Sequence, residues 1–104
     1  MAITMLYMTA PSKEVASDLA KKMVEEKLAA CVNILGSNTS IYFWDGKVSA
    51  DSEVTMIVKT IESKYEQLLE WTKLTHPYDV PCVLKIPILD GLKEYNDWIH
   101  DYLS

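Results

Sequence analysis

The stretch SIYFWDG, residues 40–46, decides the fold of this chain. Ile41 to Trp44 are β-branched or aromatic, which is typical of a strand. Asp45-Gly46 follows at once and is a strong signal for a two-residue hairpin turn. Beyond it, Val54–Lys59 is again rich in strand-forming residues and returns as the partner. The sequence therefore predicts a β-hairpin that turns at residues 45 and 46.

The predicted hairpin is unusually long, because Cys31–Leu35 extends the strand pattern upstream. Each arm would reach roughly 40 Å at ~3.3 Å per residue, about twice the usual strand length. A chain of 104 residues cannot cover such a ribbon, which leaves Ile41, Phe43 and Val48 in water. We infer that other subunits cover it. The alternative is a bend at residues 36–37 that folds the hairpin back on itself.

The flanking segments alternate between strand and helix patterns and predict one domain over residues 1–104. We expect strands at Ile3–Met8 and Val83–Ile88, a helix capped by Ser12, a second helix from the capping box Ser63–Glu66 to Pro77, and a closing helix at Leu92–Leu103. Pro87 places the last strand at a sheet edge or a strand end. This order predicts an α+β fold, a ferredoxin-like βαββαβ sandwich with both main helices on one face of an antiparallel sheet.

Composition excludes several classes of function. The net charge is −5 and all ten cations are lysines, so the arginine-rich surface of a nucleic-acid-binding protein is absent. The three glycines are not spaced to form a phosphate-binding loop. No apolar run approaches the roughly 20 residues of a membrane span, and the first residues do not resemble a secretion signal. Cys31 and Cys82 fit no paired metal spacing, so we expect reduced thiols in a cytoplasmic protein.

The segment THPYDVP, residues 75–81, gathers an imidazole, a phenol and a carboxylate between two prolines. The prolines restrict their own φ and the conformation of the preceding residues, so the loop is rigid. His76 has three possible roles: a metal ligand, a proton carrier, or a structural imidazole that bonds to carbonyls freed at the end of the preceding helix. The last role is physically sufficient.

Other candidate residues lie outside this loop. Cys31 precedes a central strand, where a free cysteine usually packs in the core, whereas Cys82 follows the polar loop. A nucleophilic set of either cysteine with His76 and Asp79 has no supporting local signature, so we do not expect an enzyme. Glu53 and Lys59 share one strand face by odd parity but lie about 20 Å apart along the strand, so they cannot pair directly.

Several motifs, taken together, resemble the CutA family of divalent-cation-tolerance proteins. They are Thr9–Pro11, Leu28–Asn33, Tyr42–Lys47, Glu53 followed by Lys59-Thr60, and His76–Pro81, and they cover nearly the whole chain. The resemblance implies a ferredoxin-like subunit in a homotrimer built like the PII signalling proteins, with hairpins that extend onto neighbouring subunits. It also implies binding of copper or another divalent cation, or of a small ligand, in clefts between subunits, and no catalytic reaction. The alternative is a PII-like scaffold that binds another protein.

The resemblance also suggests where these functions reside. Family members regarded as copper-binding have a cysteine late in the first strand and two histidines before Pro-Tyr, where this chain has Met8 and Thr75-His76. Met8 and His76 are therefore the candidate metal ligands, a pair that suits soft Cu(I). The cleft candidates are Cys31, Glu53, Lys59, Tyr78 and Asp79. The trimer-interface candidates are Ile41, Tyr42, Phe43 and Trp44.

Overall fold

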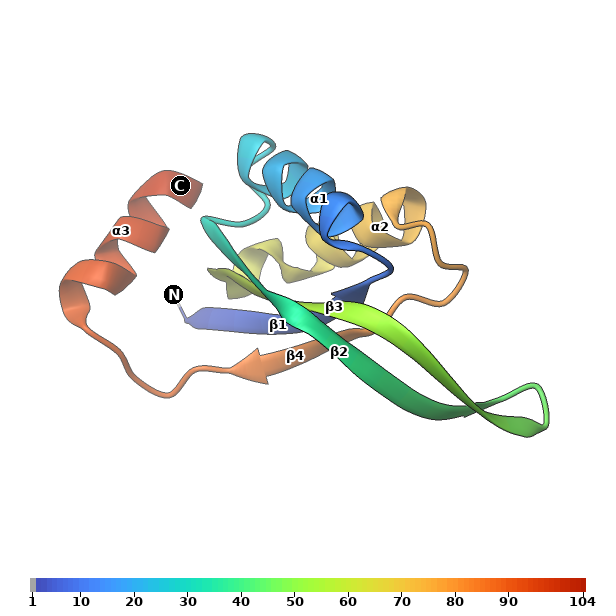
Figure 1. The fold of residues 1–104 in the computed structure, drawn as a ribbon. Helices are drawn as coiled ribbons and strands as arrows, with labels where there is room; N and C mark the ends of the chain where they lie inside the picture. Colours follow the sequence, from blue (N-terminus) through green and yellow to red (C-terminus); the bar gives the residue numbers. More distant parts are fainter. Residues whose placement is uncertain (1) are drawn as a thin grey trace.

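The computed structural model describes residues 2–104, which form four strands and three α-helices (Figure 1). They are β1 (Ile3–Ala10), α1 (Lys13–Glu25), β2 (Cys31–Trp44), β3 (Lys47–Ile61), a 3₁₀ turn (Glu62–Lys64), α2 (Tyr65–Thr75), β4 (Val83–Pro87) and α3 (Lys93–Leu103). None of the helices in the described part is long and apolar enough to cross a bilayer.

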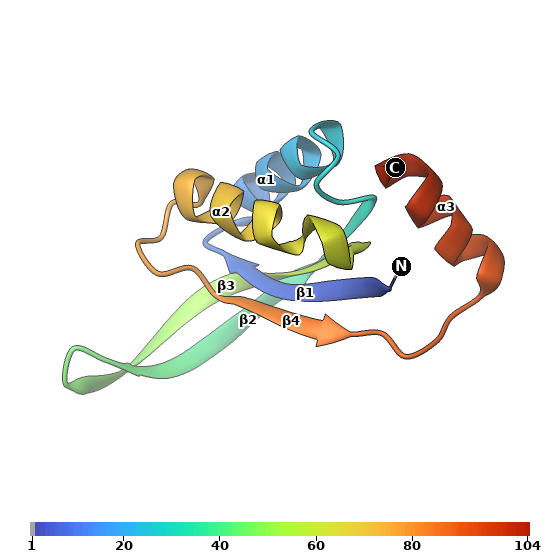
Figure 2. The same cartoon turned by 180° about the vertical axis from the view of Figure 1, so that it is seen from behind.

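The sheet has the order β2-β3-β1-β4, and every neighbouring pair is antiparallel. Helices α1 and α2 lie side by side on one of its faces (Figures 1 and 2). The predicted α+β, ferredoxin-like arrangement is therefore confirmed. β4 is an edge strand and Pro87 is its last residue, so the proline lies both at a sheet edge and at a strand end.

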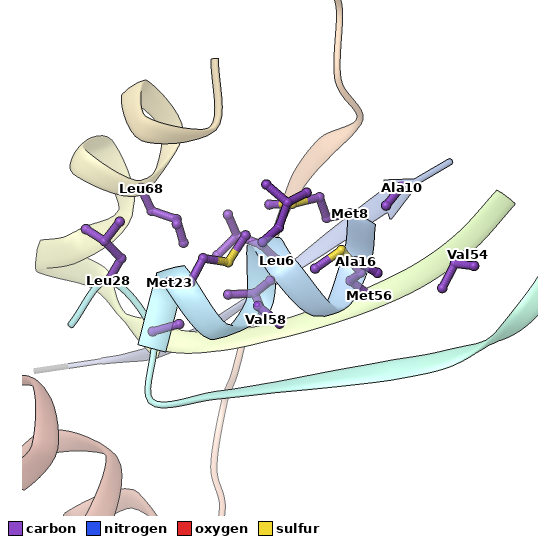
Figure 3. Close-up of a cluster of buried hydrophobic side chains, with 13 residues drawn as sticks. Leu6, Met8, Ala10, Ala16, Met23, Leu28, Val54, Met56, Val58 and Leu68 are labelled. Atoms are coloured by element: carbon purple, nitrogen blue, oxygen red, sulfur yellow. The ribbon is translucent and has the colours of Figure 1, made fainter. Parts of the chain in front are cut away.

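The core lies between the two helices and the sheet (Figure 3). Alternate residues of β1 and β3 point into this core from the sheet, including Leu6, Met8 and Met56. Met23 and Leu68 point into it from the helices. The strand alternation has period two, so the odd-numbered residues of β1 and β3 point to the opposite face of the sheet.

The β2–β3 hairpin extends well beyond the helices, and the molecule is 45 Å along its longest axis (Figure 1). Asp45 and Gly46 both have positive φ, 51° and 78°, so the predicted two-residue turn forms. β1 pairs with β3 only as far as Ala10 opposite Val54, so residues 47–53 pair with β2 alone. The alternative in which the chain folds back at residues 36–37 is wrong.

A register shift in β2 between Ile34 and Ser37 takes the place of that bend. Before it Asn33 lies opposite Ile57, and after it Asn38 lies opposite Glu53, so the parity of β2 changes relative to β3. Even-numbered residues of the outer part of β2 therefore share a face with odd-numbered residues of β3. Tyr42 and Trp44 lie on the face away from the helices, and Ile41 and Phe43 lie on the other.

The two predicted helix starts have different outcomes. Ser12 caps α1, and its Oγ accepts a hydrogen bond from the Val15 N–H at 3.2 Å. The predicted capping box at Ser63–Glu66 is wrong, because the chain first makes the 3₁₀ turn and α2 begins at Tyr65 without a side-chain cap. Ser63 is inside that turn and is exposed.

Candidate functional site

A cleft of about 600 Å³ lies between the outer hairpin and the loop that follows α2. We call it the hairpin cleft. Its lining residues are Thr9, Pro11, Tyr42, Trp44, Asp51, Ser52, Glu53, Tyr78, Asp79, Val80 and Cys82. The end of β1, both strands of the hairpin and the rigid loop thus meet at one site, although they are far apart in the sequence.

Glu53 joins the hairpin to the loop within one chain. The Tyr78 hydroxyl donates to Glu53 Oε2 at 2.8 Å, and Ser40 Oγ donates to Oε1 at 2.6 Å. Burial, followed by the bond to this carboxylate, raises the pKa of Tyr78 well above its ordinary value. Glu53 thus contacts the polar loop of its own chain.

A second phenol and carboxylate pair lies farther out on the hairpin. The Tyr42 hydroxyl donates to Asp51 Oδ2, and this hydrogen bond is the main cause of the raised pKa of Tyr42. Tyr42 was expected at a trimer interface together with Phe43, but the two side chains lie on opposite faces of the hairpin, and Tyr42 lines the cleft.

The hairpin cleft is strongly acidic. Asp51, Glu53 and Asp79 line it, and no lysine does. The ion pairs found among residues 2–104 involve other carboxylates. Burial, and secondly the charge of Glu53, raises the pKa of the Cys82 thiol above its ordinary value. A cation entering the cleft would therefore meet an uncompensated negative field.

His76 lies behind the loop that lines the cleft and is only 6% exposed. Its Nε2 lies 2.8 Å from the Thr9 carbonyl oxygen, which can only accept, so Nε2–H donates. Its Nδ1 accepts from the Tyr78 N–H at 3.1 Å. The ring thus links β1 to the loop. The structural role is the one the sequence favoured, but the carbonyl belongs to Thr9 rather than to the end of α2.

The two candidate metal ligands are both engaged elsewhere in this protomer. Met8 is fully buried in the core, and both ring nitrogens of His76 are in hydrogen bonds. Among residues 2–104, no group of three or more His, Cys, Asp or Glu side chains is arranged to hold a metal ion. The donors of one protomer therefore do not fit a complete metal site. Copper bound by His76 would have to displace one of these hydrogen bonds.

The structure does not bring every cleft candidate together. Cys31 and Lys59 lie opposite each other on β2 and β3, at the end of the sheet away from the hairpin turn. The Lys59 ammonium donates to the Tyr95 hydroxyl at 3.2 Å and lies 5.3 Å from the centroid of that ring. Both cysteines are free, and only Cys82 lines the cleft.

Sequence reasoning missed Asp51, which lines the cleft, and Ser40, which donates to Glu53. Asp51 lies two residues before Glu53, so strand alternation alone places both carboxylates on one face. Ser40 could not be placed in this way, because the register shift changes the parity of β2. Glu53, Tyr78 and Asp79 line this cleft within one chain, whereas the cleft in which they were expected lies between subunits.

Known proteins resemble this chain along almost its whole length. The family profile described as CutA1 divalent ion tolerance protein matches residues 4–102. The divalent-cation tolerance protein CutA of Thermus thermophilus is 47% identical over 96 residues, which cover 92% of this chain and 93% of that protein. The structure of the periplasmic divalent cation tolerance protein CutA from Archaeoglobus fulgidus has a TM-score of 0.95 and 44% identity, covering 98% of this chain and 99% of that one. CutA1 from Oryza sativa has a TM-score of 0.96 and 41% identity, covering 100% and 95%. This chain therefore belongs to the family of CutA1 divalent ion tolerance proteins.

Proposed function

We propose that this chain serves divalent-cation tolerance as a binding protein without catalysis, and that the hairpin cleft binds its ligand. The observation that carries the proposal is the acidic cleft itself, in which Asp51, Glu53 and Asp79 face a space of about 600 Å³ without a lysine. Such a site attracts cations, either a metal ion or a small organic molecule. The family's name is consistent with this.

We propose further that the chain acts as a homotrimer. Ile41 and Phe43 are 72% and 70% exposed, and Val48 lies beside them, so the helix-side face of the outer hairpin is apolar and uncovered in a single chain. A neighbouring copy that covers this strip would remove it from water. In the described part of one protomer no complete group of metal donors is present, so a metal site would need donors from a second copy.

Copper binding through Met8 and His76 remains part of the proposal for the assembled trimer. His76 would have to give up its bond to Thr9 or Tyr78, and a neighbouring subunit would have to supply further donors. We also propose a cytoplasmic location, because Cys31 and Cys82 are both free thiols, which suits a reducing compartment.

The second candidate function is a PII-like scaffold that binds another protein. It is favoured by a separate apolar surface near β4 and α3, where Leu84, Leu89 and Leu92 are exposed. A stoichiometric partner retained by the wild type in an affinity pull-down, and lost in Leu89→Asp, would support this candidate.

Calorimetric titration of Cu(I) and Cu(II) tests the principal proposal. We expect the wild type to bind with a Kd tighter than about 10 μM, or about −7 kcal/mol, and Glu53→Gln to bind at least tenfold more weakly. Met8→Leu then separates the two candidate metal sites, because it removes the thioether of the Met8 and His76 pair and leaves the residues that line the cleft unchanged. If the wild type bound neither copper ion nor any organic cation, the cleft would not be the functional site.

A further inference from the structure

Two carboxylates of the hairpin cleft are held at a defined spacing. Asp51 and Glu53 are two residues apart on one face of β3, which separates them by roughly 6.6 Å along the strand. Each accepts a hydrogen bond from a phenol, Asp51 from Tyr42 and Glu53 from Tyr78, and Glu53 accepts a second one from Ser40. These bonds occupy only part of the four lone-pair sites of a carboxylate, so both groups can still accept from a ligand.

Aromatic rings lie beside these carboxylates. Tyr42 and Trp44 are on the same face of the outer hairpin as Asp51, and Tyr78 lies across the cleft. The Trp44 indole lies farther out on the hairpin, roughly 13 Å along the strand from Asp51, because Trp44 pairs with Lys47 whereas Asp51 pairs with Ser40. Electron-rich ring faces next to carboxylates are suited to organic ammonium ions, which the rings attract by cation–π interaction.

The size of the cleft also favours an organic ligand over a bare metal ion. Its volume of about 600 Å³ is within the range of small-molecule sites, roughly 300–1,000 Å³. The cleft carboxylates do not converge with other donors into a metal-binding group in the described part of the chain. Pro11, Val80 and Trp44 add apolar surface, which a metal ion would not use but a hydrocarbon chain would.

We propose that the hairpin cleft binds a small aliphatic diamine, with one ammonium group on Asp51, the other on Glu53, and the methylene chain against the rings of Tyr42 and Tyr78. A chain of four methylenes separates its nitrogens by roughly 6 Å, from five bonds of about 1.5 Å at tetrahedral angles. This matches the spacing of the carboxylates along β3. The inference depends on the proposed function, in which the cleft is the ligand site, and it names the chemical class of the ligand.

The test is calorimetric titration of the full-length chain with 1,4-diaminobutane and, in parallel, with 1-aminobutane, at neutral pH and low ionic strength. We expect the diamine to bind at least tenfold more tightly than the monoamine, because only the diamine reaches both carboxylates. This comparison uses the wild type alone, so it does not depend on the folding of any variant. Equal affinities for the two amines, or no binding of either, would overturn the inference.

Variants locate the binding site. Asp51→Asn and Glu53→Gln keep the size of each side chain, and each should weaken diamine binding at least tenfold and reduce the preference over the monoamine. The matched control is Glu25→Gln, an exposed carboxylate of α1, which should bind as the wild type does. Wild-type affinity in both carboxylate variants would place the diamine elsewhere and refute the proposal.

The outcomes separate this inference from the function on which it depends. If copper binds and Glu53→Gln weakens it, but the diamine shows no preference, then the cleft is a ligand site and only the diamine assignment fails. If neither copper nor either amine binds, both proposals fail together.

Discussion

At the residue scale, one histidine determines the shape of the cleft. His76 is buried, donates to the Thr9 carbonyl and accepts from the Tyr78 N–H, so it fixes the loop against the end of β1. Tyr78 can then reach Glu53 across the cleft. The imidazole is therefore a positioning group for the site whether or not it ever binds a metal.

His76→Ala should lower the free energy of unfolding by about 1–3 kcal/mol, because it leaves the Thr9 carbonyl and the Tyr78 N–H without their partner. Urea denaturation at one fixed protein concentration measures the change. His100→Ala is the matched control, since His100 lies on α3 away from the cleft, and its effect should stay within about 0.5 kcal/mol. Equal effects of the two substitutions would contradict the structural role of His76.

The raised pKa of Tyr78 makes stability depend on alkaline pH. In the unfolded chain the phenol loses its proton near pH 10, whereas in the folded chain burial and Glu53 keep it protonated to higher pH. The folded state then binds more protons, so this contribution is complete below pH 10 and is lost as the pH rises further.

Denaturation at a series of pH values below and above 10 should show this decline, and Tyr78→Phe should make it shallower. Tyr65→Phe is the control, because Tyr65 lies at the start of α2 and outside the cleft, and it should leave the decline unchanged. A decline that is the same in Tyr78→Phe and in the wild type would show that this phenol is not responsible.

At the element scale, the register shift in β2 determines which residues become the site. It lies between Ile34 and Ser37, and beyond it Tyr42 and Trp44 share a face with Asp51 and Glu53. Without the shift, Ile41 and Phe43 would occupy that face instead. One irregularity in a strand therefore separates the polar cleft from the apolar strip on the same hairpin.

The starts of α1 and α2 differ in their caps, and this difference can be tested. Ser12→Ala should lower the free energy of unfolding by about 1 kcal/mol, because it removes the hydroxyl that accepts from the Val15 N–H. Ser63→Ala should change it by less than about 0.5 kcal/mol, because Ser63 caps nothing in the structure. Urea denaturation measures the free energy of unfolding of both variants. A large decrease in Ser63→Ala would show that Ser63 does cap the helix.

At the scale of the whole molecule, the outer hairpin is a surface without a cover. It reaches beyond the helices (Figures 1 and 2). Its helix-side face carries Ile41, Phe43 and Val48. The core of the subunit ends near Val54, where β1 stops pairing with β3. A single chain therefore has no further element to place on this strip.

Sedimentation of the wild type should give a trimer, and Phe43→Asp should shift the population to smaller species, because a charge would be buried in the contact. Leu74→Asp is the matched control. Leu74 is 87% exposed on α2 and should tolerate the change without loss of assembly. A wild type that stays monomeric at micromolar concentration would show that the exposed apolar strip is not a contact between copies.

Much of the fold follows from local sequence signals. Asp45-Gly46 specifies the hairpin turn, Pro87 places β4 at an edge, and Ser12 marks the start of α1, because each acts on its own backbone or on that of near neighbours. The failure at Ser63 has a local reason too. The chain leaves β3 through a 3₁₀ turn, which occupies the residues that the capping box would have used.

The candidate site was predicted only in part. Glu53, Tyr78 and Asp79 were recognised, but Lys59 and Cys31 were grouped with them and lie elsewhere. Parity along β3 correctly placed Glu53 and Lys59 on one face. It could not show that the loop reaches only Glu53, because that contact joins residues 25 positions apart.

The sequence by itself determined the strand and helix order, the long hairpin, the acidic character and the membership of the CutA1 family, since these depend on periodicity, turn residues, composition and motifs. The tertiary structure alone decided that Asp51, Glu53 and Tyr42 meet Tyr78 in one cleft and that His76 bonds to Thr9. These contacts depend on strand register and on packing between distant segments. A shift of one residue in β2 reverses the face of every side chain beyond it. Gly36 marks where the strand is irregular, but it does not specify a shift in register rather than a bend.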